Sequence, residues 1–306
     1  MNIFLQATFE GLSLGAVYSL VAIGFVLIFR ATDVLSFAQP AMVVVGAGFI
    51  SYFATQIGIS FWIAFFLGII LTGILGFIIE RTFLRPMVGE PVFSVAVLTI
   101  GIDILLRVVL DNWIGINPKY MGDPFPSFGN FGSLNIGGLT IKYLEVTALI
   151  TSLILIFVLS VFFKRSKYGV AMRATSLDQE AALAQGINVG RVFGLVWFIA
   201  GLLAAFAGFF ITGGFNTLTN SSFISALRAL PAVVIGGLDS ITGAVIGSLV
   251  IGLTQAYVGY YQFDIESAYN IKLGNGFSIV APYLIMFVIL LIKPHGLFGT
   301  EEVERV

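Results

Sequence analysis

Long apolar stretches, separated by short polar segments, recur along the whole chain. Each has about 20 residues, the length that an α-helix needs to cross the hydrocarbon core of a bilayer. They cover residues 8–29, 40–56, 61–79, 92–110, 143–163, 191–212, 241–260 and 277–292, with a shorter apolar piece at 224–238. The pattern predicts an all-α, polytopic membrane helix bundle of about 8–9 transmembrane segments, forming one permease domain over residues 1–306.

The composition supports a membrane protein with closely packed helices. Hydrophobic residues make up 58% and charged residues 10% of the chain, whereas a soluble domain has about 25% charged residues. Many of the 35 glycines lie inside the apolar stretches. Because lipid provides no hydrophobic drive for helix association, small residues that let backbones approach are typical of helix contacts in membranes.

Basic residues predict the orientation. They follow the first, third and fifth apolar stretches and occur again near the C-terminus: Arg30, Arg81, Arg85, Lys164, Arg165, Lys167, Arg173, Lys293 and Arg305. Segments rich in Lys and Arg stay on the cytoplasmic side, so the N-terminus is expected outside and the C-terminus inside. This orientation requires the piece at 224–238 to cross, or nearly cross, the membrane. The first apolar stretch has no basic leader and is expected to be a retained span.

The segment 111–142 is predicted to be the largest external loop. It is rich in Asn, Gly and Pro, and its weak alternation at 139–143 indicates a small hairpin. Two interpretations stay open: a connector, or a docking surface for a protein that delivers substrate.

The chain lacks the residues that most enzymes need. It has no Cys and a single histidine, His295, so neither a thiolate nucleophile nor a clustered metal site is predicted. The phosphate-binding motif Gly-x-x-x-x-Gly-Lys-Ser/Thr is missing, so the chain is not expected to hydrolyse ATP itself. A net charge of −1 also argues against a nucleic-acid partner. We therefore predict no catalytic residues, and no metal or cofactor bound by this chain.

Asp103 and Arg107 lie inside one apolar stretch, four residues apart, and therefore on the same helical face. Charges at membrane depth are costly and suggest a function. The alternative is a self-neutralising intramembrane ion pair that holds neighbouring helices, which the position of Arg107 near the outer end favours.

Two segments have a Pro that opens a short, Gly-ended apolar run: 36–46 and 229–237. Paired segments of this kind indicate broken helices around a site at the membrane midplane, although chance similarity of apolar strings is the alternative. Because Pro40 lacks a backbone N–H and lipid cannot satisfy the freed carbonyl, Ser36, Phe37 and Gln39 are predicted to line the translocation path. Phe37 would act as an apolar constriction. Alternatively, Gln39 caps the following helix.

The predicted cytoplasmic loop, residues 164–190, contains a short helix. Capping residues at 175–178 precede residues 179–185, which favour helix, and Gly186 provides the stop. Glu180, Ala181 and Ala182, followed by Gly186, resemble the EAA-x-x-x-Gly loop of ABC importer permeases. In that family, small side chains let the helix enter a groove of the ATPase, so the resemblance implies that these four residues couple to ATP hydrolysis.

Four separated motifs resemble the branched-chain amino-acid ABC transporter permease family, of the LivH type. They are residues 11–20 (GLSLGAVYSL), 35–39 (LSFAQ), 234–244 (VIGGLDSITGA) and 293–299 (KPHGLFG). Pro40-Ala41 stands where the family usually has Gly and an acidic residue. The bend or the substrate there is therefore expected to differ.

The resemblance implies a bacterial inner-membrane complex. Two cytoplasmic ATPase subunits would bind ATP and Mg, and the second permease subunit would be LivM-like or another copy of this chain. A periplasmic substrate-binding protein would deliver leucine, isoleucine or valine, although close relatives carry urea, short amides or aromatic acids. The rival interpretation is an ATPase-independent secondary transporter or channel in which 164–191 is only a connector.

Overall fold

The computed structural model describes residues 2–115, 119–122, 132–136, 139–213, 217–218, 222–274 and 276–299. Within them, seven helices are long and apolar enough to cross a membrane. They are α1 (Asn2–Thr32), α2 (Ala38–Ser51, continued by a π-helical turn Tyr52–Ile57), α3 (Phe61–Ile79), α4 (Val92–Ile114), α5 (Tyr143–Arg165), α8 (Val189–Gly213) and α11 (Ile241–Tyr269). Shorter apolar helices are α9 (Ser222–Leu227), α10 (Ala229–Gly236) and α12 (Phe277–Ile292). Every apolar stretch of the sequence is thus helical, and the predicted all-α membrane bundle is confirmed.

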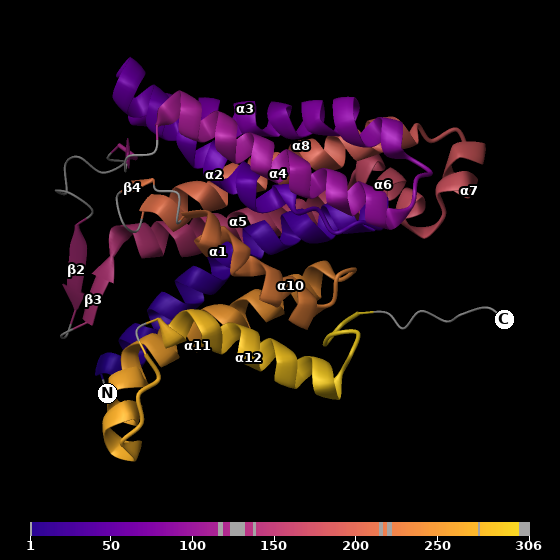
Figure 1. Ribbon diagram of the computed structural model, residues 1–306. Helices are drawn as coiled ribbons and strands as arrows, with labels where there is room; N and C mark the ends of the chain where they lie inside the picture. Colours follow the sequence, from indigo (N-terminus) through magenta and orange to yellow (C-terminus); the bar gives the residue numbers. More distant parts are fainter. Residues whose placement is uncertain are drawn as a thin grey trace.

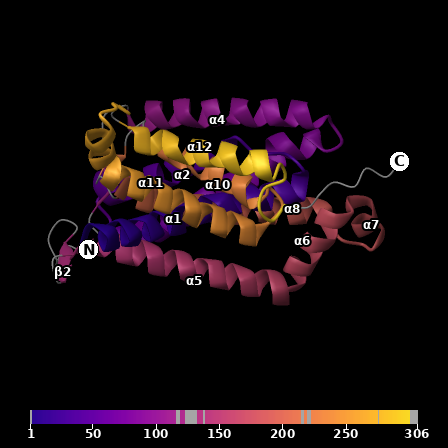
Figure 2. The ribbon, with the colours of Figure 1, turned by 90° about the horizontal axis from the view of Figure 1, so that it is seen from below.

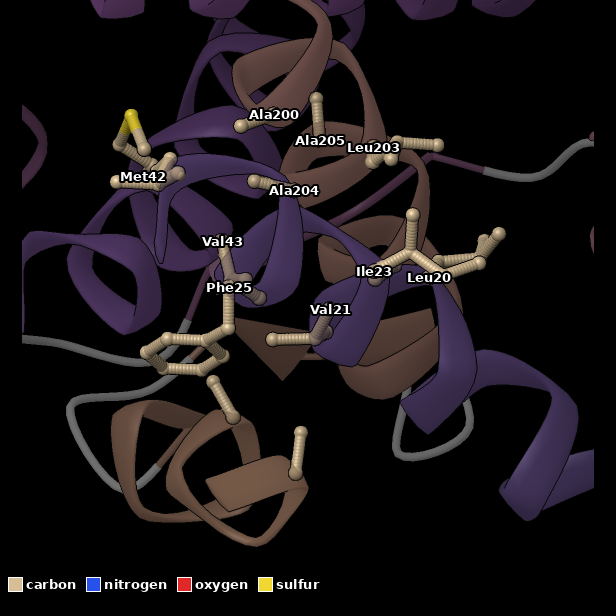
Figure 3. Packing of buried hydrophobic residues seen from close by; sticks show 14 of the residues in the cluster. Leu20, Val21, Ile23, Phe25, Met42, Val43, Ala200, Leu203, Ala204 and Ala205 are labelled. Atoms are coloured by element: carbon tan, nitrogen blue, oxygen red, sulfur yellow. The ribbon is translucent and has the colours of Figure 1, made fainter. Parts of the chain in front are cut away.

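The centre of the bundle is built by α1, α2 and α8. Side chains from all three converge there, with Phe25 of α1, Met42 of α2 and Ala204 of α8 among them (Figure 3). The helices approach closely because α8 has a glycine at the contact: a Cβ on Gly208 would lie 2.2 Å from the carbonyl oxygen of Val43. Lipid provides no hydrophobic drive for helix association, so the small residues at the contact explain the tight packing.

Helices α4 and α5 are peripheral and lie at opposite edges of the bundle (Figure 2). Only 22% and 11% of their most apolar windows are buried, against 83% for α1 and 78% for α8. Their exposed residues are large and apolar, such as Phe93 and Phe157. A helix that is apolar on its exposed face fits a lipid environment, so among the seven long helices these two are the most exposed to lipid.

The two ends of the bundle differ. Two short helices, α6 (Lys167–Leu177) and α7 (Gln179–Ala184), cover the end at which α12 also finishes (Figure 1). At the opposite end lie the start of α1 and a hairpin of β2 (Ser133–Ile136) and β3 (Leu139–Lys142), which pair antiparallel. The hairpin expected near residue 139 is confirmed, and the basic segment at α6 lies at the opposite end from it, as the predicted orientation requires.

A second strand pair closes the hairpin end: β1 (Lys119–Tyr120) runs antiparallel to β4 (Thr217–Leu218). Two-residue strands have no alternating pattern, so the sequence did not indicate them. The other parts of the expected external loop, residues 116–118, 123–131 and 137–138, lie outside the described residues.

Candidate functional site

The helix pair α6–α7 is shaped by two local hydrogen bonds and a glycine. Ser166 Oγ accepts a hydrogen bond from the backbone N–H of Gly169 at 2.9 Å and so caps α6. Asp178 has an extended backbone that separates the helices, and its Oδ1 accepts from the N–H of Ala181 at 2.9 Å. Gly186 follows α7 with φ of 80°, a conformation that favours glycine. The expected cap and stop are present, and the preceding residues form a helix of their own.

The predicted coupling residues do not share one face. Glu180, Ala181 and Gly186 are exposed, whereas Ala182 is only 3% exposed and packs against its own chain. Coupling of these four residues to an ATPase stays a prediction, and the burial of Ala182 means that its methyl group does not face outward in this structure. The apolar side chains that do face outward are Leu177, 88% exposed, and Leu183, 58% exposed. The sequence could have indicated this exposed face, because Leu177 and Leu183 are two leucines within a polar segment.

The pair is tied to the ends of the long helices. Gln179 Nε2 donates a hydrogen bond to the carbonyl of Ala31, near the end of α1, at 3.5 Å. Arg85 lies just beyond α3 and donates a hydrogen bond of 2.6 Å to the carbonyl of Gly190, at the start of α8. Arg85 also forms an ion pair of 2.9 Å with the buried carboxylate of Glu80. A force applied to α7 would thus reach α1, and Arg85 and Glu80 link the start of α8 to α3.

Ser36 and Phe37 lie in the short connection between α1 and α2. Ser36 is 1% exposed, and its hydroxyl has no hydrogen-bond partner among the described residues. It lines a small cavity of about 90 Å³, together with Thr99 and Gln179. Phe37 is half-buried, and its backbone N–H donates to Thr99 Oγ1 at 3.1 Å. Their place in the translocation path stays a prediction.

Gln39 is enclosed by protein. Its side chain is fully buried and donates to the carbonyl of Ala200 at 3.3 Å. The helix α2 begins at Ala38 and has no side-chain cap, so the alternative that Gln39 is a cap is wrong. Pro40 falls in the first turn of α2, where no intrahelical N–H is needed. The helices are interrupted at residues 33–37, before Pro40, so a break is present in this segment but Pro40 itself does not cause it.

Asp103 and Arg107 form an ion pair in α4, in which Arg107 Nη2 donates to Asp103 Oδ2. The guanidinium carbon of Arg107 also lies 4.1 Å from the ring centroid of Phe223 in α9, within reach of a cation–π interaction. The pair thus neutralises its own charge and connects α4 to α9. A role in transport is a separate hypothesis that this geometry does not require.

One charged residue was missed. Arg228 lies between α9 and α10 and lines a cavity of about 230 Å³ with Tyr18 and Gln255. The signal was available, because this arginine interrupts the apolar piece at 224–238. No group of three or more His, Cys, Asp or Glu side chains that could hold a metal ion occurs in the described part of the chain.

A bundle of long apolar helices with a short helix pair across one end is the architecture of a polytopic membrane protein. The family model described as "Branched-chain amino acid transport system / permease component" matches residues 7–292. The chain therefore belongs to the branched-chain amino-acid transport system permease family.

Relatives match along nearly the whole chain. The high-affinity branched-chain amino acid transport system permease protein LivH of Salmonella typhimurium is 30% identical over 99% of this chain and 98% of its own length. The permease protein BraD of Pseudomonas aeruginosa, described for the same kind of system, is 27% identical over the same shares. A probable LivH of Methanocaldococcus jannaschii is 27% identical over 92% of this chain and 88% of its own.

Proposed function

We propose that the chain is the permease of an ATP-driven importer that carries branched-chain or other hydrophobic amino acids across the bacterial inner membrane. The family membership over residues 7–292 supports the permease role. The relatives LivH and BraD are named for high-affinity branched-chain amino acid transport, which supports the substrate class. Energy would come from two partner ATPase subunits that bind ATP and Mg, because the sequence has no phosphate-binding motif of its own.

The other partners follow from the same proposal. A second permease, LivM-like or another copy of this chain, would complete the membrane part. A periplasmic binding protein would deliver the substrate at the hairpin end, opposite α6 and α7. The selectivity of the importer would then depend largely on that binding protein.

The observation that carries the proposal is the outward face of α6–α7. Leu177 and Leu183 are exposed at the end expected in the cytoplasm, next to the exposed Ala181. Burying a leucine side chain contributes about 1.5–3 kcal/mol, so two leucines in a partner's groove would stabilise a complex. Because Gln179 contacts the end of α1, movement of the docked ATPase would be transmitted into the bundle.

The test is a single charge on this face. Leu183→Asp, expressed with its ATPase subunits, is expected to insert normally but to lose at least tenfold in ATPase co-purification and in leucine uptake, since a carboxylate cannot enter an apolar groove without a desolvation cost. The matched control is Leu134→Asp in β2, where the leucine is 40% exposed at the opposite end. It should retain the ATPase subunits. Normal ATPase binding and uptake in the Leu183→Asp complex would contradict the docking surface.

The rival mechanism has its own test. The chain alone, in proteoliposomes with an ion gradient and no ATPase, is expected to take up no leucine. Uptake under these conditions would establish a secondary transporter or channel and overturn the proposal.

A further inference from the structure

Arg228 divides a membrane segment into two half-helices. Its backbone N–H bonds to the carbonyl of Ser225 at 3.3 Å, which closes a turn after α9, and α10 begins at the next residue. Pro231 lies in the first turn of α10, where it is compatible with a helix. Arg228 itself keeps a helical backbone conformation (φ −64°, ψ −15°), so the irregularity is confined to one residue of an interrupted segment, a feature found around substrate sites of membrane transporters.

The contacts of Arg228 place its side chain near the middle of the membrane. Tyr18 is one residue past the centre of α1, Gln255 is the central residue of α11, and the Tyr18 hydroxyl donates to Gln255 Oε1 at 3.0 Å. The guanidinium of Arg228 lies beside this hydroxyl, and Tyr283 of α12 is within its electrostatic range. The views agree that α10 lies beside α1, α11 and α12 (Figures 1 and 2).

No carboxylate within the described part of the chain forms an ion pair with this guanidinium. Arg85 pairs with Glu80, Arg107 with Asp103 and Lys142 with Glu145, and none of these ion pairs involves Arg228. Its Nε is enclosed and has no hydrogen-bond partner in the described chain. An intramembrane cation without a counter-charge is costly and marks a functional site.

The acids of the same cavity are already engaged and lie farther out. Glu10 accepts a hydrogen bond from the Tyr260 hydroxyl at 2.7 Å, and Glu145 pairs with Lys142 at 3.4 Å. Glu10 precedes Tyr18 by eight residues, about 12 Å along a helix. Both acids thus have partners other than Arg228, although they line the same cavity.

The cavity offers both a charge and apolar walls. Its volume of about 230 Å³ far exceeds the roughly 10–15 Å³ needed for one water molecule. Leu14, Val17 and Phe210 are among its apolar lining residues, and the charged lining residues are Arg228, Lys142, Glu10 and Glu145, of which Lys142 and Glu145 pair with each other. A few polar groups within an apolar wall are typical of a small-molecule site, and a guanidinium matches the geometry of a carboxylate.

We infer that Arg228 binds the carboxylate of a hydrophobic amino acid inside the permease, with the side chain of the substrate against Leu14, Val17 and Phe210. The site recognises the carboxylate and not the ammonium group, because Glu10 is held by the Tyr260 hydroxyl and Glu145 by Lys142. This inference rests on the proposed function, since it assigns the amino acid carried by the importer to this cavity.

The first test measures thermal unfolding of the purified full chain with L-leucine, 4-methylpentanoate (a carboxylate without an amine) or leucinol (an amine without a carboxylate). Leucine and 4-methylpentanoate are expected to raise Tm by about 5 °C at a hundred times Kd, and leucinol should have no effect. Arg228→Gln should abolish the shift, whereas Arg228→Lys should retain a weaker one. Arg191→Gln, which alters an exposed arginine at the start of α8, is the matched control and should respond like the native chain.

A second measurement uses only the native chain, in case Arg228→Gln does not fold. Phenylglyoxal modifies accessible arginines, and peptide mass spectrometry reports each site. Leucine is expected to slow modification of Arg228 at least fivefold without protecting Arg191, and leucinol should protect neither.

Three results would overturn the inference. They are no Tm shift with leucine or 4-methylpentanoate, a Tm shift of the same size in Arg228→Gln, or protection of Arg228 from phenylglyoxal by chloride that equals the protection by leucine. Leucine uptake by the assembled importer, together with any of these results, would remove the site and leave the proposed function intact. Absence of ATP-driven uptake would instead count against the proposed function.

Discussion

Two helices of this bundle, α2 and α10, start in the same way and end in different surroundings. Each has a proline in its first turn, Pro40 or Pro231, and a polar residue nearby, Gln39 or Arg228. Gln39 is fully enclosed and bonded to the carbonyl of Ala200. Arg228 instead faces a cavity of about 230 Å³. The local sequence pattern marks the start of a helix, whereas the neighbouring helices decide whether its polar residue is sealed or accessible.

The neighbour that seals α2 is α8, and glycine is the reason it can approach. A side chain on Gly208 would strike the backbone of Val43, which cannot move aside as a flexible side chain can. Around Arg228, the side chains of α1, α9 and α11 leave space instead. The predictions below test this contrast, from the largest expected effect to the smallest.

Gly208→Val is expected to have the largest effect. Its Cβ alone would lie 2.2 Å from Val43 O, so α8 must move away from α2, at a cost of about 3 kcal/mol or more. The variant should accumulate poorly and unfold at a lower temperature. Gly101→Val in the peripheral α4 is the control, because nothing lies within 4 Å of a Cβ there. Equal stability of the two variants would show that α8 does not seal α2.

Changing Gln to Glu should destabilise the protein strongly at position 39 and only slightly at position 255. Gln39→Glu introduces a charge into a fully enclosed place and is expected to destabilise the protein by about 3 kcal/mol at neutral pH. Gln255→Glu places a carboxylate beside Tyr18 and in the cavity of Arg228, which supplies a counter-charge, so the effect on Tm should be small. The comparison fails if thermal unfolding shows that Gln255→Glu is the more damaging change.

Asp103→Asn tests a third intramembrane charge. The change leaves Arg107 with the ring of Phe223 as its remaining described partner. We expect a loss of about 2 kcal/mol, below the 3–5 kcal/mol of a fully buried pair, because the Arg107 side chain is 33% exposed. The double variant Asp103→Asn with Arg107→Gln should be more stable than the single one. A stable double variant that cannot transport would assign the pair to the translocation path.

The elements could be predicted because their signal is local. Apolar length located the spanning helices, and the cap at Asp178 and the stop at Gly186 are chemistry within a few residues of α7. The burial of Ala182 could not be predicted, because it depends on how α7 lies against α8, which no short motif encodes. The setting of Gln39 likewise depends on Gly24 and Ala200, residues distant in the sequence.

Single cysteines distinguish sealed from accessible positions with little change in stability. The native chain has no Cys to react, so we compare Gln39→Cys, Ser36→Cys and Ser225→Cys. Ser225 lines the cavity of Arg228, and Ser36 lines the smaller cavity with Gln179. We expect a membrane-impermeant thiol reagent to modify Ser225→Cys from outside and Ser36→Cys only from the cytoplasmic side, while Gln39→Cys stays unmodified.

Mass spectrometry after labelling of right-side-out and inside-out vesicles gives the extent of reaction at each position. The fully exposed Leu177→Cys, at the cytoplasmic end, is the positive control for inside-out vesicles. Rapid labelling of Gln39→Cys would show that α2 is open to water and would restore Gln39 to the translocation path. The contrary result is that Ser225→Cys resists the reagent in both kinds of vesicle while Ser36→Cys reacts. The start of α2 would then be accessible to water and the start of α10 would not, which is the reverse of the expected contrast.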